Sequence, residues 1–263
     1  MPDTKIYAVA NQKGGVGKTT SVINIASMLG SRGLKTLIVD IDPQANATSG
    51  LGYNKYDFEQ STYQLLLHEV EFNQIVVNNA DYHLDILPAS PSLAGEEVDL
   101  VNVDKREYRL KHALAADNGH YDYILIDCPP SLSLLTINAL AAATSGVLIP
   151  VQCEYLALEG LTQLLQTVEL VQKQINEKLT VRGLIMTMYD GRTNLSRQVV
   201  EEVRQYFKSK VFRTIIPRNI RLSEAPSYGQ PINIYAPKSA GAIAYQLLAV
   251  ELLKGDQKMK AAV

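Results

Sequence analysis

The chain has 263 residues, a length that single α/β domains reach, so we expect one large domain. Hydrophobic residues make up 46% of the chain and charged residues 20%, which is typical of a globular protein with a sizeable core and excludes a disordered chain. The formal net charge of −2 gives no overall field that would attract nucleic acid or acidic lipid. Any such partner therefore requires a local basic patch.

Several common classes of site are disfavoured. Cys128 and Cys153 lie far apart in apolar surroundings and are expected to be buried thiols, not a disulfide or a zinc site. The four histidines form no H-E-x-x-H motif, and no G-x-S-x-G motif is present, which argues against metallohydrolases and serine hydrolases. No signal segment opens the chain, so secretion is not expected. The stretch from Cys128 to Cys153 carries no charge, but its prolines predict a buried loop, helix and strand, not a membrane span.

Short apolar runs alternate with helix-length amphipathic segments along the chain. The expected strands are Lys5–Ala10, Lys35–Asp40, Leu84–Leu87, Tyr121–Asp127, Gly146–Val151, Val181–Met188 and Val211–Ile216. The clearest expected helices are Lys18–Ser31, Ser133–Ala143, Ala157–Leu179, Asn194–Lys208 and Ala240–Leu253. This alternation predicts an α/β fold, a doubly wound and mostly parallel sheet flanked by helices. The irregular region Tyr53–Arg109 is expected to pack small helices around the strand at Leu84. We expect a single domain over residues 1–254 and a short flexible tail over residues 255–263.

A glycine-rich segment joins the first expected strand to the first expected helix. It reads Asn11-Gln12-Lys13-Gly14-Gly15-Val16-Gly17-Lys18-Thr19-Thr20. In a phosphate-binding loop the glycines let backbone N–H groups surround an anion, and the helix N-terminus adds partial positive charge. Lys18 is expected to reach the β and γ phosphates of a nucleotide, and the Thr19 hydroxyl to ligate Mg²⁺. The G-x-x-x-x-G-K-[ST] pattern fails at one position, where Gln12 replaces glycine, and a second lysine, Lys13, lies inside the loop.

Two further expected strands end in aspartates. Asp40 and Asp42 follow one apolar run, and Asp127 ends another that has the Walker B form. The polarity of a parallel sheet places these strand ends beside the phosphate loop. Clustered carboxylates repel one another unless a cation or a proton-transfer task justifies them. The sequence therefore predicts a Mg-nucleotide site, although Asp42 is also compatible with a cap on the following turn.

From Lys5 to about Leu253 the chain resembles the ParA family of chromosome and plasmid partitioning ATPases, of the short Soj type. The matching segments are N-Q-K-G-G-V-G-K-T-T from Asn11, D-I-D-P-Q-A-N-A-T-S-G-L-G from Asp40, I-D-C-P-P-S-L-S-L-L-T-I-N-A-L from Ile126, P-V-Q-C-E-Y-L-A-L-E-G-L from Pro150 and I-I-P-R-N-I-R-L-S-E-A-P-S-Y-G from Ile215. The segment K-G-G-V-G-K-T has the deviant Walker A form of the ParA/MinD class of P-loop NTPases. One departure is Ala45, where many relatives carry glycine.

The resemblance implies ATP and Mg²⁺ as cofactors and assigns roles to the matching positions. Lys13, Lys18 and Asp42 are the implied catalytic residues: Lys13 crosses to the partner subunit's phosphates in an ATP-sandwiched dimer, and Asp42 positions the attacking water. The implied nucleotide contacts are Lys13, Gly14, Gly15, Val16, Gly17, Lys18, Thr19, Thr20, Pro217, Arg218 and Asn219, the last three holding the adenine. The implied metal-site residues are Thr19, Asp40 and Asp127.

Basic residues concentrate in one part of the chain. From Arg182 to Lys238 there are ten basic and four acidic residues, so this segment carries +6 and the remainder −8. Such a face suits phosphate contacts without base readout. On charge alone, helix Asn194–Lys208 is equally compatible with a solvated face. The resemblance adds that Arg192 and Arg221 fall where relatives contact DNA.

The implied function is an ATP-driven switch in the cytoplasm, associated with the nucleoid. ATP binding forms a homodimer, the dimer binds non-specific double-stranded DNA, and hydrolysis stimulated by a ParB-type centromere-binding protein releases it; no membrane partner is expected. The alternatives are a MinD-like membrane-cycling ATPase, a metabolic ligase resembling dethiobiotin synthetase and an iron–sulfur reductase resembling nitrogenase iron protein. The short, weakly apolar tail argues against the first, Lys13 and the basic segment against the second, and the position of Cys128 against the third.

Overall fold

The computed structural model describes residues 4–95, 99–100, 103–117, 119–154 and 157–261. Within these residues, seven strands form one sheet in the order β3-β4-β2-β5-β1-β6-β7. The strands are β1 (Lys5–Val9), β2 (Thr36–Asp40), β3 (Val77–Asn79), β4 (Leu84–Leu87), β5 (Tyr123–Asp127), β6 (Gly146–Gln152) and β7 (Val181–Thr187). All neighbouring strands pair in parallel except β3, which is antiparallel to β4 at one edge. The predicted doubly wound, mostly parallel sheet is confirmed.

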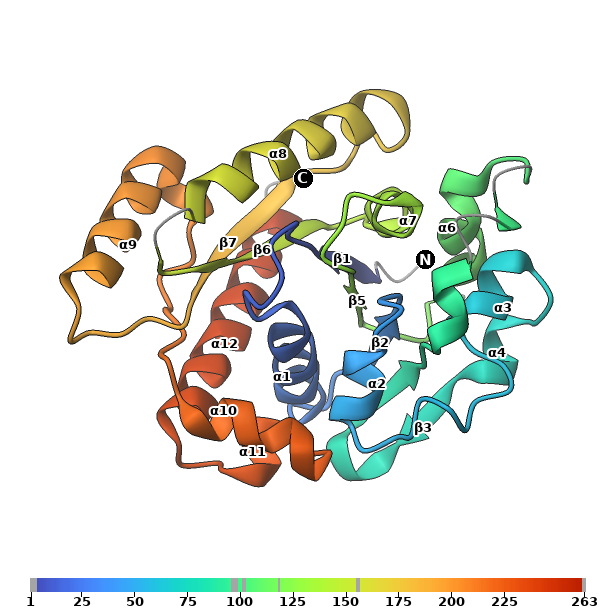
Figure 1. Cartoon of the computed structure of the whole chain (residues 1–263), viewed down its shortest axis with the longest axis horizontal. Helices are drawn as coiled ribbons and strands as arrows, with labels where there is room; N and C mark the ends of the chain where they lie inside the picture. The colour runs from blue at the N-terminus through green and yellow to red at the C-terminus, as the bar shows by residue number, and fades with distance from the viewer. Residues whose placement is uncertain (1–3, 96–98, 101–102, 118, 155–156, 262–263) are drawn as a thin grey trace.

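Helices cover both faces of the sheet (Figure 1). The α-helices are α1 (Lys18–Gly30), α2 (Asn46–Gly50), α3 (Thr62–Leu67), α4 (Phe72–Ile75), α6 (Arg109–Leu114), α7 (Leu134–Ala142), α8 (Ala157–Gln174), α9 (Asn194–Phe207), α10 (Ile220–Glu224), α11 (Ile232–Tyr235) and α12 (Ala240–Ala261). Residues of β1 alternate between the two faces: Tyr7 and Val9 join the core beneath α1 and α12, whereas Ala8 joins the core beneath α7, α8 and α9. The sheet is therefore buried on both faces, as parallel sheets require.

The segment Val211–Ile216 forms no strand of the sheet, contrary to the prediction. It runs beside β7, where the Phe212 N–H donates to the Leu184 carbonyl and the Ile216 N–H to the Met186 carbonyl. Between these contacts, the N–H groups of residues 213 and 214 donate to the Glu251 carboxylate on α12. The Glu251 side chain thus accepts from backbone N–H groups that are not then available for continuous pairing with β7, so the segment does not form a strand.

The C-terminal segment expected to be loose is helical, since α12 continues to Ala261; residues 262–263 lie outside the described part of the chain. Asp256 explains the extension. Its carboxylate is buried and accepts hydrogen bonds from the hydroxyls of Tyr7 at 2.7 Å and Tyr123 at 2.9 Å, and it pairs with Arg182 at 3.1 Å. Gly255 permits this close approach, because a Cβ there would lie 2.1 Å from the Arg182 guanidinium.

The charge-free stretch between the two cysteines folds as predicted, into a loop, α7 and the buried strand β6. Cys128 and Cys153 are both buried and free, and burial raises the pKa of each thiol. The region Tyr53–Arg109 packs short helices around β4, and the structure adds the antiparallel edge strand β3. Among the described helices, none combines the length and the apolar character needed to cross a membrane.

Candidate nucleotide-binding site

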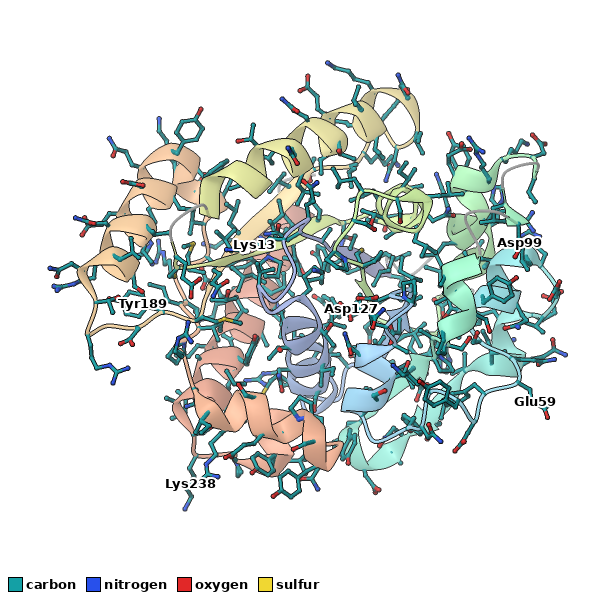
Figure 2. The ribbon with its side chains drawn as sticks, viewed as in Figure 1. Lys13, Glu59, Asp99, Asp127, Tyr189 and Lys238 are labelled. Carbon is teal, nitrogen blue, oxygen red and sulfur yellow. The ribbon has the colours of Figure 1, made fainter. Side chains whose placement is uncertain are left out.

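Three loops meet where the central strands end. In the sheet β5 lies between β1 and β2, and the register pairs Asp127 with Val9 on one side and with Asp40 on the other. Because these strands are parallel, the glycine-rich loop after β1 and the carboxylates that end β2 and β5 emerge at the same edge. The residues predicted for phosphate and metal binding are therefore brought together. Figure 2 shows Lys13 and Asp127 near the centre of the molecule, around the start of α1.

The glycine-rich loop is held in shape by side chains from outside it. Asn11, which is buried, donates to the Pro150 carbonyl of β6 at 2.7 Å and accepts from the Lys13 N–H at 3.0 Å. The Thr187 hydroxyl at the end of β7 donates to the Val16 carbonyl at 2.8 Å. Gly17, the residue before α1, has φ +89°, a left-handed conformation that favours glycine. The loop is thus preorganised for a ligand at the N-terminus of α1.

Lys18 opens α1 and is itself buried. Its ammonium group donates to the Lys13 carbonyl at 3.3 Å, so it lies curled within the loop. Burial lowers the pKa of Lys18, and the charge of Asp127 partly opposes this effect. Burying the Lys18 ammonium away from water is costly, and an anion bound in the loop would offset this cost. The site therefore favours a ligand that carries phosphate.

The two carboxylate oxygens of the buried Asp127 differ in their hydrogen bonding. Its Oδ2 accepts from the Thr19 hydroxyl at 2.7 Å, whereas its Oδ1 is buried and has no hydrogen-bond partner among the residues that the structure describes. Burial raises the pKa of Asp127 well above its ordinary value, and the neighbouring charge of Asp40 adds to this rise. An oxygen pair of this kind, a threonine hydroxyl and a free carboxylate oxygen, matches what Mg²⁺ takes from proteins when phosphates supply further ligands.

Asp40 and Asp42 differ in their surroundings. Both oxygens of the buried Asp40 are occupied: Oδ1 accepts from the Asp42 N–H, and Oδ2 accepts from the N–H and the hydroxyl of Thr48 at 2.8 Å. Burial raises the pKa of Asp40 to about 7, against these hydrogen bonds. Asp42 is also largely buried, accepts from the Gln44 N–H and lines the cavity at the loop. Asp40 therefore organises the loop, while Asp42 faces the space where a ligand would lie.

Two cavities that share lining residues adjoin this loop. The first has a volume of about 550 Å³ and is lined by the loop glycines, Lys18, Thr19, Asp42 and, from a distant segment, Ala225, Pro226, Ser227 and Gln230. The second, of about 520 Å³, is lined by Pro217, Arg218 and Asn219. Both cavities share Gly17, Thr20, Met188 and Pro226. The three positions that the resemblance assigned to adenine thus lie on the same trench as the phosphate loop.

Several residues of the site escaped the sequence analysis. Thr48 holds Asp40, Thr187 holds the loop, and Met188, which lines both cavities, has φ +52°, a strained conformation for a side chain of this type. Of these residues, only Thr48 could have been found from the sequence, because it lies within the D-I-D-P-Q-A-N-A-T motif. Thr187 carries no such signal because the Val16 carbonyl that it contacts lies 171 residues earlier in the chain. Met188 lies outside every motif of the sequence.

The two arginines predicted to bind DNA lie on neighbouring exposed segments outside the trench. Arg192 follows β7 in the loop that leads to α9, and Arg221 lies on α10. Tyr189 forms a bridge with Pro217, and the Arg218 N–H donates to the Tyr189 carbonyl at 2.9 Å, which joins the two segments. Each arginine pairs with a carboxylate, Arg192 with Asp190 and Arg221 with Glu224.

Comparison with known proteins agrees with this geometry. Residues 4–181 match the protein family described as the AAA domain. The chain is 56% identical to the sporulation initiation inhibitor protein Soj of Bacillus subtilis over 248 residues, which cover 94% of this chain and 98% of Soj. It is 52% identical to the chromosome partitioning protein ParA of Myxococcus xanthus, covering 96% of this chain and 89% of ParA.

Solved structures give the same fold with nucleotide in place. A structure named cobyrinic acid a,c-diamide synthase from Mycobacterium smegmatis, with a bound ATP analogue and magnesium, has a TM-score of 0.86 and 40% identity and covers 97% of this chain and 96% of its own. The septum site-determining protein MinD of Pyrococcus horikoshii, complexed with Mg-ADP, has a TM-score of 0.79 and 27% identity, covering 95% and 96%.

A glycine-rich loop between a buried strand and a helix, followed by Lys18 and Thr19 and faced by the strand-end Asp127, defines a P-loop nucleotide-binding protein. Within that class, the chain belongs to the Soj/ParA family of P-loop ATPases.

Proposed function

We propose that this chain is an ATP-dependent DNA-partitioning ATPase, a switch in which ATP binding forms a DNA-binding dimer and hydrolysis resets it. The observation that carries the proposal is the glycine-rich loop in which Lys18 contacts the carbonyl of the additional lysine, Lys13, and Thr19 contacts Asp127, in a chain 56% identical to Soj. Among the relatives, two more are named chromosome partitioning proteins at 46% and 51% identity. The shared names and the shared site support the same role here.

The residues present fit ATP and Mg²⁺. The loop backbone from Gly14 to Thr20 and the Lys18 ammonium would hold the phosphates, and the segment Pro217–Asn219 would hold the adenine. The unpartnered Oδ1 of Asp127 and the Thr19 hydroxyl would hold the metal. Bound Mg²⁺ supplies positive charge that offsets the charge developing on the transferred phosphoryl group. Asp40, whose oxygens are occupied by its own chain, would act by fixing the loop that carries Asp42.

Hydrolysis requires a water held in line with the terminal phosphate. Asp42 is the carboxylate of the cluster that lines the cavity, and its backbone position is fixed by Asp40 and Ala45. We assign it the role of orienting the attacking water. Lys13 would contribute its charge to the nucleotide of the partner subunit: its N–H and carbonyl are both engaged within the loop, and the hydrogen bonds that hold them leave the side-chain ammonium available for such a contact. Gly14, which is exposed beside it, would lie at the dimer contact.

The basic segment would supply the contact with DNA. Arg192 and Arg221 would bind phosphates of non-specific duplex DNA, and dimerisation would double the number of contacts. A ParB-type centromere-binding protein would stimulate hydrolysis, and the cytoplasmic nucleoid would be the place of action. No membrane partner is proposed, because the end of α12 is fixed to the sheet through the buried Asp256 and is not a free amphipathic helix.

A metabolic reaction on the same scaffold is the competing proposal, since one solved neighbour carries the name of a diamide synthase. The identity with that protein is 40%, against 56% with Soj. Lys13 and the +6 charge of residues 182–238 also favour the partitioning ATPase.

Two variants test the proposed switch by ATP turnover and by gel filtration. Asp42→Ala should keep ATP binding, abolish turnover and leave a long-lived ATP dimer, because the attacking water loses the carboxylate that orients it while Lys18 and the phosphate loop are unchanged. Lys18→Ala should lose ATP binding and with it the dimer, because the phosphates lose their main cation. Undiminished hydrolysis by Asp42→Ala would remove its assigned role. ATP-dependent dimers of Lys18→Ala would contradict the nucleotide site itself.

A further inference from the structure

Both arginines proposed to bind DNA are already engaged by acidic neighbours. Arg192 is 88% exposed, and its guanidinium makes two contacts with Asp190, Nε to Oδ1 at 2.9 Å and Nη2 to Oδ2 at 2.7 Å. The Arg221 Nη1 lies 2.8 Å from Glu224 Oε2, an oxygen that also accepts from the Tyr235 hydroxyl at 3.0 Å. Neither guanidinium therefore meets DNA as an unpaired cation.

The two pairs belong to one surface. The loop that carries Asp190 and Arg192 is tied to the segment before α10 by the bridge between Tyr189 and Pro217. Between them lies a third pair of the same kind, Arg218 with Glu154 at 2.9 Å. In Figure 2 the labels of Tyr189 and Lys238 mark the side of the molecule on which this surface lies, away from Asp127.

Asp190 accepts from the Arg192 N–H and Glu224 from the Tyr235 hydroxyl, contacts that need an oxygen but not a charge. Both arginines are more than half exposed, so their ion pairs with these carboxylates contribute little to folding. A carboxylate and a phosphate compete for the same planar guanidinium fork. A DNA phosphate must therefore displace or share each carboxylate, and each carboxylate also cancels the charge that would attract the duplex.

Resting on the proposed DNA binding, we propose that Asp190 and Glu224 are counter-charges that set the affinity of this surface for duplex DNA. They keep the contact made by one protomer weak, so that stable binding requires the two copies of the surface that an ATP dimer brings together. The dependence of DNA binding on ATP then arises from the ion pairs of Arg192 and Arg221 with these carboxylates as well as from the dimer interface.

The test neutralises each carboxylate without changing its size. Asp190→Asn keeps an oxygen for the Arg192 N–H, and Glu224→Gln keeps one for the Tyr235 hydroxyl. Binding to a duplex of arbitrary sequence is measured at low salt with Mg-ATP and without nucleotide. A charge removed about 6 Å from a phosphate alters binding about threefold in water, so two copies in a dimer give about tenfold tighter binding for each substitution. The double variant should also bind measurably without nucleotide.

Two controls isolate the position of the charge. Glu169→Gln removes the same charge from the exposed Lys173–Glu169 pair on α8, where the Nζ–Oε1 distance is 2.6 Å, and should leave DNA affinity within about twofold of wild type. In an Arg192→Ala background, Asp190→Asn removes repulsion between the carboxylate and a phosphate but no competition for a guanidinium, so the gain in that background measures the repulsion alone. Thermal unfolding of each variant verifies that the fold is retained.

The outcomes separate this inference from the function on which it rests. Tighter binding by Asp190→Asn and Glu224→Gln, absent from Glu169→Gln, supports it. Unchanged or weaker binding, or an equal gain with Glu169→Gln, overturns it while the proposed function stands. Failure of the wild-type protein to bind DNA in its ATP state overturns the proposed function as well.

Discussion

At the scale of single residues, the Asp127 carboxylate lowers the stability of the fold and at the same time provides an oxygen for a bound cation. The carboxylate is fully buried, and one of its oxygens has no partner within the described part of the chain, although a buried polar atom without a hydrogen bond is costly. The nearby Asp40 adds like charge, although its own oxygens are satisfied. The ligand-free protein therefore holds an electrostatic strain that a bound cation would relieve.

Asp127→Asn should stabilise the ligand-free protein while it removes the response to Mg-nucleotide. The substitution keeps the shape and a contact with Thr19 but removes the buried charge, so we expect a gain of roughly 1 to 2 kcal/mol in the free energy of unfolding at neutral pH. Thermal unfolding with and without Mg-ADP measures both effects. A ligand-free variant less stable than wild type, or one still stabilised by Mg-ADP to the wild-type extent, would contradict this account of the carboxylate.

The same carboxylates predict a pH dependence. The folded state raises the pKa of Asp40 from 3.8 to about 7, so between these values the native protein binds a proton that the unfolded chain has released. The contribution to stability is therefore complete below about pH 4 and is lost as pH rises to about 7. A cation favours the ionised form, so stabilisation by Mg-nucleotide should grow over that same window. A series of unfolding curves between about pH 5 and pH 8 measures both trends; parallel trends with and without Mg-nucleotide would oppose this explanation.

Which residues of the site could be predicted depended on the range of their contacts. Lys18, Thr19 and Asp127 were predictable because the phosphate loop is a local pattern and because parallel strands end at the same edge. Asn11 and Thr187 hold the loop through contacts with β6 and from β7, which no local spacing reveals. The different environments of Asp40 and Asp42 were also out of reach, because they depend on the way Thr48 folds back onto β2.

At the scale of elements, two glycines bring the far wall of the nucleotide cavity together. Gly52 follows α2, and Gly229 follows the short 3₁₀ helix Ala225–Tyr228; both have positive φ. A Cβ on Gly229 would lie 2.5 Å from the Gly52 Cα, so the two backbones touch without an intervening side chain. The contact fixes the spacing between α2, which carries Ser49 and Gly50 of the cavity, and the segment with Pro226.

Gly229→Ala should cost roughly 2 to 4 kcal/mol of stability and weaken nucleotide binding, because the new methyl group collides with backbone that cannot move aside. Gly33→Ala is a matched control: Gly33 also has positive φ, +80°, but a Cβ there would meet nothing within 4 Å, so only the conformational cost of about 1 kcal/mol applies. Chemical denaturation and nucleotide titration measure the two effects. Equal losses for both variants would show that the contact between the two glycines has no role.

The elements that sequence patterns predicted are those with continuous apolar runs, and β4 even has the predicted bounds Leu84–Leu87. The strand β3 was missed because Val77–Asn79 is short and mostly polar. The run Val211–Ile216 has the apolar pattern of a strand, but Glu251 takes two of its N–H groups. The end of α12 was missed because a charged Asp256 after a glycine signals a helix end, unless two tyrosines and an arginine bury the aspartate.

At the scale of the whole molecule, charge is segregated although the net charge is only −2. The segment from Arg182 to Lys238 carries +6 and comprises β7, α9, α10 and α11, which lie together on one side of the structure, from yellow to red in Figure 1. The remaining −8 includes the buried carboxylates of the nucleotide site. Nucleotide binding and polyanion binding are thus assigned to different regions of one fold, connected through β7 and the segment Pro217–Asn219.

The central claim is that ATP switches DNA binding on, and binding of the purified protein to duplex DNA of arbitrary sequence tests it most directly. The measurement compares ATP, ADP and no nucleotide across a salt series. We predict tight binding only with ATP, with a slope of log affinity against log salt of about −4 for the four phosphate contacts that Arg192 and Arg221 supply in a dimer. Absence of binding in every nucleotide state, with an ATP-dependent dimer verified, would contradict the account and favour a metabolic or membrane-cycling relative. Binding that is equal in all three states would contradict the switch.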